Sequence, residues 1–269
     1  MKGKFHLATV RPRIDVLGNI AFAQGDVLFD WHRFEIPRGA CAIKSFNIID
    51  AGKDAAATAG IDMELFFAKS VNGVAPPSIA DSNSTAVTKT QWAACRTHII
   101  AHTGMLDASA MENADTYTLS YNVWDQAAVG DQVENQLQPG GIMLEGDPNY
   151  RGTTPGYQSI WMMAITDGAN DYGTGVLLDQ AGDQDAVAKT TTSETTLTVS
   201  GSQATLVFAV GDELISFVEA NGSTPKKIGK VTEVVSATSI KVDHVEEGFG
   251  DDTEICFRAP LQFNFGLEY

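Results

Sequence analysis

Cys95, His98 and His102 are the side chains whose types and spacing come nearest to a metal site. A thiolate and two imidazoles on one helical face can converge on zinc. The segment offers no fourth ligand nearby and lacks the glutamate of an HExxH protease, and Ile99 with Ile100 is typical of a packed segment. We therefore expect ordinary structural histidines, with no metal and no other cofactor.

Two acidic turns, 167–171 and 179–185, could attract calcium because hard cations prefer several carboxylate and carbonyl oxygens. Neither turn has EF-hand spacing. Ala169 occupies a ligand position, and Tyr172 stands where the turn glycine belongs. Solvated loops between strands are the expected structure, with calcium binding as the alternative.

No arrangement typical of nucleophilic or phosphoryl chemistry is present in the sequence. Ser159, in GYQSIW, lacks the second glycine of a nucleophile elbow and begins a hydrophobic run. The Gly-Thr-Gly at 173–175 lacks the GK[ST] continuation of a phosphate-binding loop. Carboxylate pairs such as Asp62 with Glu64 are too numerous in so acidic a chain to indicate a glycosidase. We expect a protein that is not an enzyme, with no catalytic residues.

The tryptophans could stack on sugar rings, as in a lectin, or could pack in the core. Trp31, Trp124 and Trp161 lie within apolar or alternating runs. Core packing is therefore the expected role, with Trp92 the tryptophan closest to the surface.

Alternation of apolar and polar residues predicts an all-β fold. Val27, Phe29 and Trp31 alternate with polar neighbours until Pro37 and Gly39, where a strand ladder must stop. Further strands are expected at 43–49, 63–67, 117–123 and 160–166, with 176–178 beside the last of these. The run IWMMAIT at 160–166 is continuous enough to be a central strand.

Two stretches give weaker signals. The pattern is indistinct over 75–113, where 89–98 is compatible with a short helix or a strand. The stretch 127–155 contains many turn residues, which predicts long surface loops. Ordered long loops tend to bind something, so we expect a subunit contact there.

A change of composition near Asp179 predicts a domain boundary near Gln184. Beyond it, short strands expected at 195–199, 206–217, 227–235, 239–242 and 254–257 fit a small barrel or sandwich. The alternation of 261–269 is the clearest strand pattern, and we expect it to complete the first domain. The predicted domains are an extended arm (1–13), a β-sandwich or jelly-roll-like main domain (14–183 plus 258–269) and an inserted small β-barrel (184–257).

The 269 residues include 18 basic and 34 acidic side chains, which give a formal charge of −16. Such a charge repels phosphate backbones, so we expect no nucleic-acid partner. The start has no apolar signal region, and no later run is long enough for a membrane helix, so we expect a soluble protein with no membrane partner. Cys41, Cys95 and Cys256 are odd in number and have apolar neighbours, which predicts buried free thiols.

Four cations, Lys2, Lys4, Arg11 and Arg13, precede the first acidic residue. Two interpretations stay open. The segment is either a frayed, solvated end or an arm that docks on an acidic neighbouring subunit. In the second case these four residues bind the partner.

The sequence VGDELISFVEANGSTPKKIGKVTEVVSATSIKV at 210–242 resembles a small β module of tailed-bacteriophage virion proteins. A looser resemblance covers FDWHRFEIPRGACAIKSFNIID and MELFFAK, which are similar to β-sandwich or jelly-roll capsid decoration proteins. This resemblance implies a decoration, or cement, protein that is synthesised in the host cytoplasm. It would bind the major capsid protein on the outside of the virion as a homotrimer.

Three other functions remain open. A tail-tube or head-completion protein is a rival within the structural class. A carbohydrate-binding or adhesin module would grip a glycan with the loops around Gly140 to Gly156 and with Trp92. Hydrolysis by an acidic pair is the least favoured.

Overall fold

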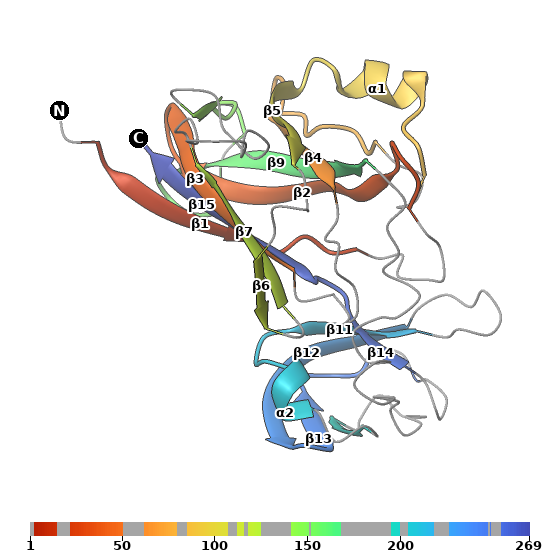
Figure 1. Ribbon diagram of the computed structural model, residues 1–269. Helices are drawn as coiled ribbons and strands as arrows, with labels where there is room; N and C mark the ends of the chain where they lie inside the picture. Colours follow the sequence, from red (N-terminus) through yellow and green to blue (C-terminus); the bar gives the residue numbers. More distant parts are fainter. Residues whose placement is uncertain are drawn as a thin grey trace.

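The computed structural model describes the chain over residues 3–14, 22–50, 62–79, 85–106, 112–115, 118–124, 141–150, 152–167, 195–199, 204–217, 226–246, 248 and 254–269. Almost all of its regular elements are strands, and every pairing between them is antiparallel, so the all-β prediction is confirmed (Figure 1). The predicted boundary near Gln184, the strand at 176–178 and the acidic turn 179–185 lie outside these residues.

The larger unit consists of two sheets. The six-stranded sheet has the order β1 (Phe5–Val10), β15 (Leu261–Glu268), β3 (Cys41–Asp50), β7 (Thr118–Trp124) and β6 (Glu112–Asp115), and β8 (Ile142–Leu144) also pairs with β3. The four-stranded sheet has the order β2 (Val27–Pro37), β9 (Tyr157–Thr166), β4 (Met63–Ala68) and β5 (Ile99–Leu106). As predicted, β9 is central, since it pairs with β2 on one side and β4 on the other.

Strand β15 joins the two sheets into a sandwich. Its residues alternate strictly between buried and half-buried, as the sequence pattern predicted. The ring of Phe263 lies 5.9 Å from that of Phe29 on β2, and the ring of Phe265 lies 5.8 Å from that of Phe67 on β4. These aromatic contacts cross from one sheet to the other and form the centre of the core.

The strand pairs of the sandwich are nested in the sequence. Strand β4 pairs with β5, β3 with β7, β2 with β9, and β1 with β15, so each pair encloses the one before it. Successive pairs alternate between the two sheets. The chain therefore follows one long hairpin that is folded over itself.

The smaller unit lies below the sandwich in Figure 1 and is inserted between β9 and β15. Its sheet has the order β10 (Thr196–Thr198), β13 (Ser239–Val242), β12 (Lys226–Ser236), β11 (Glu213–Phe217) and β14 (Glu254–Phe257). Strand β12 pairs with β11 through its first half and with β13 through its second half. Among the described residues this order is an open path, and no pairing of β10 with β14 closes it into a barrel.

Helices occur at two places. Helix α1 (Lys89–Cys95) begins with a capping box between Thr88 and Gln91, which resolves the ambiguity over 89–98. Helix α2 (Ala204–Val207) occupies the start of the strand predicted at 206–217, so that prediction is wrong there. The chain turns after α2 and enters β11 only at Glu213.

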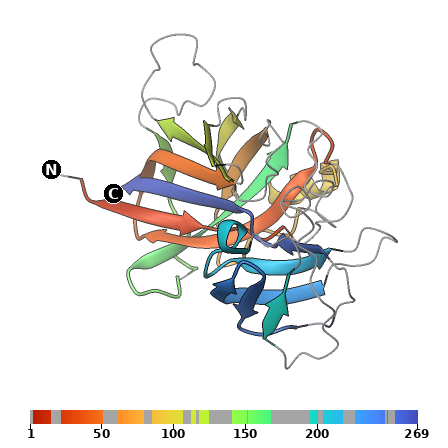
Figure 2. The ribbon, with the colours of Figure 1, turned by 60° about the horizontal axis from the view of Figure 1, so that its bottom comes forward.

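The structure contradicts the predicted N-terminal arm. Residues 5–10 pair with β15 along their whole length, from Phe5 opposite Glu268 to Val10 opposite Phe263 (Figure 2). The side chains of Ala8 and Val10 are buried. The segment is an edge strand of the sandwich because its alternation, FHLATV, turns Ala8 and Val10 toward the core while its backbone pairs with β15.

The structure also tests the predictions for the cysteines, the tryptophans and the loops at 127–155. Cys41 and Cys95 are free and buried, as predicted, and burial raises the pKa of the Cys41 thiol to about 11. Trp92 is 36% exposed, whereas Trp161 is 5% exposed, so the expected order of these two is also confirmed. The stretch 141–150 contains the short strand β8, which the prediction of continuous loops missed.

Candidate functional site

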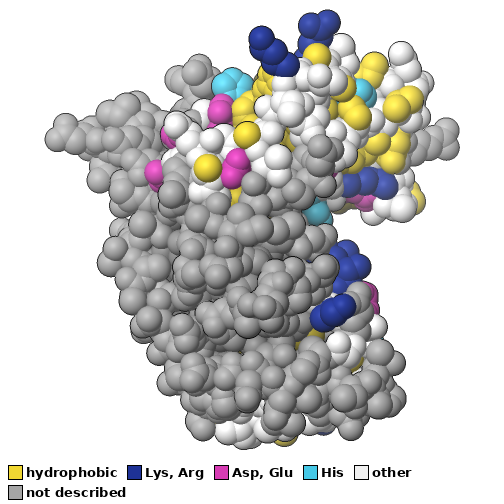
Figure 3. All heavy atoms as spheres, turned by 90° about the vertical axis from the view of Figure 1, so that its right-hand side faces the viewer, with side chains coloured by type: hydrophobic (Ala, Val, Ile, Leu, Met, Phe, Trp, Pro, Cys, Tyr) yellow, Lys and Arg dark blue, Asp and Glu magenta, His cyan; other side chains and the backbone are white. Residues whose placement is uncertain are grey.

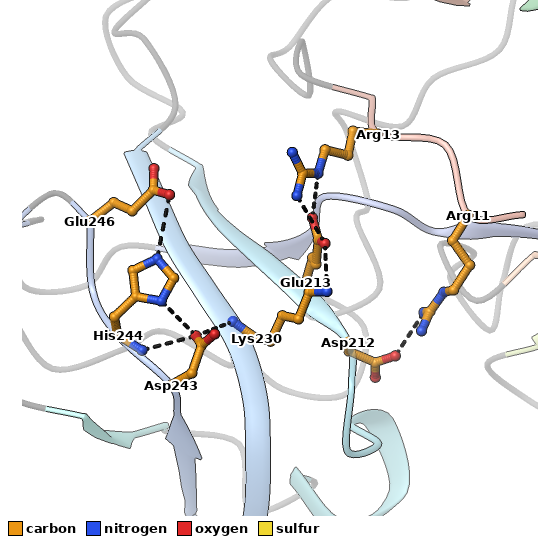
Figure 4. Close-up of polar contacts among 8 residues, drawn as sticks. All are labelled: Arg11, Arg13, Asp212, Glu213, Lys230, Asp243, His244 and Glu246. Atoms are coloured by element: carbon orange, nitrogen blue, oxygen red, sulfur yellow. Dashed lines mark hydrogen bonds and ion pairs between the residues drawn. The ribbon is translucent and has the colours of Figure 1, made fainter. Parts of the chain in front are cut away.

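Two of the cations predicted to bind a partner, Arg11 and Arg13, turn toward this chain's own smaller unit. Arg11 forms an ion pair with Asp212 at 2.8 Å, and Arg13 forms one with Glu213 at 2.7 Å (Figure 4). Lys4 exchanges backbone hydrogen bonds with Tyr269 at 3.1 and 3.0 Å. Lys2 lies outside the described residues. The structure brings two of the four predicted residues together in an ionic junction between the two units.

Glu213 is the centre of this junction. Its carboxylate accepts two hydrogen bonds from the Arg13 guanidinium, at 2.7 and 3.1 Å, and forms an ion pair with Lys230 at 3.2 Å. Burial favours the neutral acid, but these cations outweigh it and lower the pKa of Glu213. Burial and the charge of Arg13 also lower the pKa of His32 on β2. At this junction Glu213 is therefore held in its charged form, and protonation of His32 is disfavoured.

A second polar group continues from Lys230 in Figure 4. Asp243 Oδ1 accepts the backbone N–H groups of Lys230 at 2.7 Å and His244 at 2.9 Å. Hydrogen bonding to Glu246 raises the pKa of His244. These contacts fix the turn after β13 against β12. Each of these groups has a protein partner, so hydrogen bonds and ion pairs within the chain hold the arrangement together.

The residues considered for zinc do not converge. The Cys95 thiol donates to the Pro77 carbonyl at 3.1 Å, and His98 Nδ1 lies 3.0 Å from the Lys69 carbonyl. His102 Nδ1 instead lies 2.5 Å from Glu64 Oε1. No group of three potential metal ligands occurs within the described parts of the chain.

The outer face of the six-stranded sheet carries unusually exposed apolar side chains. Phe5 and Leu7 on β1 are 75% and 65% exposed, and Met143 on β8 is 59% exposed. Phe5 lies opposite Glu268 on β15, and Leu7 lies opposite Gly266. We call the outward side chains of β1, β15, β3 and β8 the outer face. Strand β1 also ends the sheet order, so no described strand pairs with its other edge.

The rest of the outer face is mostly uncharged. Thr9 donates to Asn264 at 2.9 Å, and Asn264 donates to Asn47 at 3.4 Å, which forms a polar ladder across β1, β15 and β3. Lys44 and Glu268 form an ion pair at 3.8 Å. Unlike the chain as a whole, the described part of this face has no excess of negative charge.

A different apolar region lies around α1. On the side shown in Figure 3, hydrophobic side chains gather at the upper end, which is the end that carries α1 in Figure 1. Trp92 lies on α1 and is 36% exposed, and its ring meets Phe66 edge-on at 5.2 Å. The contact ties Trp92 to the underlying sheet, so only part of the ring is open for a glycan.

The sequence contained a signal for the outer face that the prediction missed. Phe5, Leu7 and Thr9 alternate with His6 and Ala8 as a strand requires. Because cations flank this short pattern, the sequence was interpreted as an arm instead of a strand.

No family model matches this sequence, and no curated protein is significantly similar to it. Among the described residues, no helix is long and apolar enough to cross a membrane.

Proposed function

We propose that this chain is a structural subunit of a tailed-bacteriophage virion that decorates the capsid exterior and associates with copies of itself. The observation that carries the proposal is the outer face, on which Phe5, Leu7 and Met143 are exposed within a nearly uncharged sheet surface. Large exposed apolar side chains on an uncovered sheet edge are features of a protein interface.

The most suitable partner for this face is a second copy of the chain. Two copies each carry a formal charge of −16 and repel one another wherever their charged surfaces meet. The outer face lets them approach where that repulsion is weakest, and its apolar side chains gain from leaving water. A trimer, as the sequence resemblance implies, would use this face in each subunit.

The fold supports the same class of function. The nested pairing of the strands is the connectivity expected of a jelly roll, an architecture of many viral shell proteins. The buried phenylalanines make the sandwich a rigid platform, and the inserted unit adds surface for contacts with the major capsid protein. Attachment to the major capsid protein through the inserted unit is part of the proposal.

Leu7→Glu tests the self-association directly. The side chain points to solvent, so the variant should fold normally but place a negative charge in the proposed contact. Light scattering coupled to gel filtration should give about three times 28.7 kDa for the wild-type chain and the monomer mass for Leu7→Glu. Val74→Glu is the matched control, because Val74 is 64% exposed but does not belong to the outer face.

A monomeric wild-type protein, or a Leu7→Glu variant that still forms trimers, would contradict the proposed interface. The virion role needs a second measurement. Antibodies against the chain should label the outside of heads in electron micrographs of the phage that encodes it. Labelling of tails, together with rings of six or more subunits in solution, would favour the tail-tube rival.

A further inference from the structure

A pocket of about 300 Å³ lies between the turn after β2 and the loop that leads into β9. Arg38 contributes to its lining from the turn, and Tyr150, Thr154 and Tyr157 contribute from the loop and the start of β9. None of its lining residues belongs to the outer face or to the ionic junction.

Asp147 holds one wall of the pocket in place. Its carboxylate accepts the backbone N–H groups of Gly73 at 2.8 Å and Asn149 at 2.9 Å, and the hydroxyl of Ser70 at 3.1 Å. The hydrogen bond from Gly73, with that from Asn149, lowers the pKa of Asp147. Asp147 is therefore an ionised carboxylate whose two oxygens are already occupied.

Glu35 anchors the other part of the loop in a similar way. It accepts the Thr153 hydroxyl at 2.6 Å and the Thr154 N–H at 3.2 Å, and it lies 3.3 Å from the Arg33 guanidinium. Burial acts in the opposite direction, but the hydrogen bonds from these threonines lower the pKa of Glu35 to about 2. These contacts hold Thr153 and Thr154 of the loop against β2.

Arg38 differs from the other charged groups of this region. Its backbone N–H donates to the Gly156 carbonyl at 2.9 Å, which fixes where the side chain starts. Its side chain is exposed, and no carboxylate of the described residues forms an ion pair with it. In a chain with a net charge of −16, the pocket therefore presents a cation that none of the described carboxylates neutralises.

Two aromatic rings beside Arg38 are also held in position. The Tyr150 ring meets Trp161 edge-on at 5.0 Å and has the Arg33 guanidinium 5.4 Å from its centroid. The Tyr157 ring meets His6 edge-on at 5.4 Å. Both tyrosines are half-buried, so each combines a fixed ring with an accessible part. Such rings can pack against the C–H faces of a sugar.

We propose that this pocket binds a carboxylated sugar. The Arg38 guanidinium would take the carboxylate, because its planar fork of N–H donors matches the two oxygens of that group. Tyr150 and Tyr157 would contact the sugar ring, and the volume suits one or two sugar units. This binding goes beyond the structural role, which does not depend on it.

Saturation-transfer NMR with the intact protein and glucuronic acid, at low ionic strength, tests the proposal. We expect transfer to the ring protons of glucuronic acid and at least about tenfold weaker binding of glucose, which lacks the carboxylate. Acetate, the carboxylate without a ring, should compete poorly. Equal binding of glucose, or competition by acetate at the same concentration as glucuronic acid, would overturn the assignment.

Substitutions locate the site. Arg38→Ala should abolish the signal, and Arg38→Lys should weaken binding by about tenfold because lysine keeps the charge but loses the fork. Arg96→Ala is the matched control, since Arg96 is an exposed arginine at the end of α1, away from the pocket. An unchanged thermal unfolding curve shows that Arg38→Ala is folded. Binding that survives in a folded Arg38→Ala protein would refute the proposal.

Discussion

Buried aspartates in this protein hold turns in place. Asp26 accepts the backbone N–H of Ala23 and Asp212 accepts that of Ala209, each at 2.8 Å and each three residues back in the chain. Asp147 binds the backbone of two other turns. These three residues are at most 7% exposed. Burial of an acid therefore reflects turn geometry here, and the sequence alone could not distinguish such residues from catalytic carboxylates.

Glu213→Gln tests the ionic junction at the residue scale. Because the folded-state pKa of Glu213 is below its ordinary value of 4.5, its stabilising contribution is present above about pH 4.5. The contribution is lost as the pH falls through the lowered folded-state pKa. At pH 7 we expect the variant to lose about 1 kcal/mol of unfolding free energy, a modest value because Arg13 is half exposed.

Thermal unfolding of both proteins between pH 7 and pH 3 measures this effect. The difference in Tm should begin to shrink below about pH 4.5, where the carboxylate of the unfolded chain takes up a proton, and should vanish once the folded protein's carboxylate is protonated at its lowered pKa. Glu233→Gln is the control, because Glu233 pairs with Lys241 but its side chain is 54% exposed. A difference that stays constant over the whole range would show that charge at Glu213 does not stabilise the junction.

At the scale of elements, strong alternation was the reliable signal. Strands β2, β3, β9 and β15 were predicted because their apolar residues follow one face or one continuous run. Strand β1 was missed because four cations surround a short pattern, and β5 because its residues His102, Thr103 and Gly104 interrupt it. Of the candidate site, the sequence indicated Arg11 and Arg13, but as residues that bind a partner subunit rather than as ion pairs within the chain. Their partners, Asp212 and Glu213, lie 200 residues or more away in the sequence, beyond the reach of local patterns.

Gly229 determines the course of β12. It has φ +111°, and a Cβ atom there would lie 2.4 Å from the His244 carbonyl oxygen. Gly229→Ala should therefore lower the unfolding free energy by at least about 2 kcal/mol, because strain and a backbone clash add together. Urea denaturation measures the loss, and hydrogen exchange should show faster opening over 226–246.

Gly39→Ala separates the two causes. Gly39 has a similar φ of +105°, but a Cβ atom there would meet nothing within 4 Å. It should show the cost of the dihedral angle alone, about 1 kcal/mol. Equal losses in the two variants would mean that contact with the turn after β13 does not constrain β12.

At the scale of the whole molecule, charge and self-association are opposed. The formal charge of −16 acts between any two copies, whereas the described outer face has one weak ion pair and a ladder of neutral polar groups. An interface of this kind gains nothing from long-range attraction and loses affinity through long-range repulsion. The two possible docking modes, by neutral face or by cationic residues, therefore respond to salt in opposite directions.

Sedimentation equilibrium at two ionic strengths distinguishes these modes. Raising the salt concentration from about 0.1 M to about 1 M shortens the Debye length from about 10 Å to about 3 Å, which screens the repulsion between copies. We expect the wild-type association constant to rise several-fold, because salt weakens the repulsion between copies but leaves the apolar contacts of Phe5 and Leu7 unchanged. Leu7→Glu should recover only part of its lost association, since salt screens the added charge but does not replace the buried leucine. Association that weakens as salt is added would instead assign the contact to cations meeting acidic surfaces, and the outer face would not be the interface.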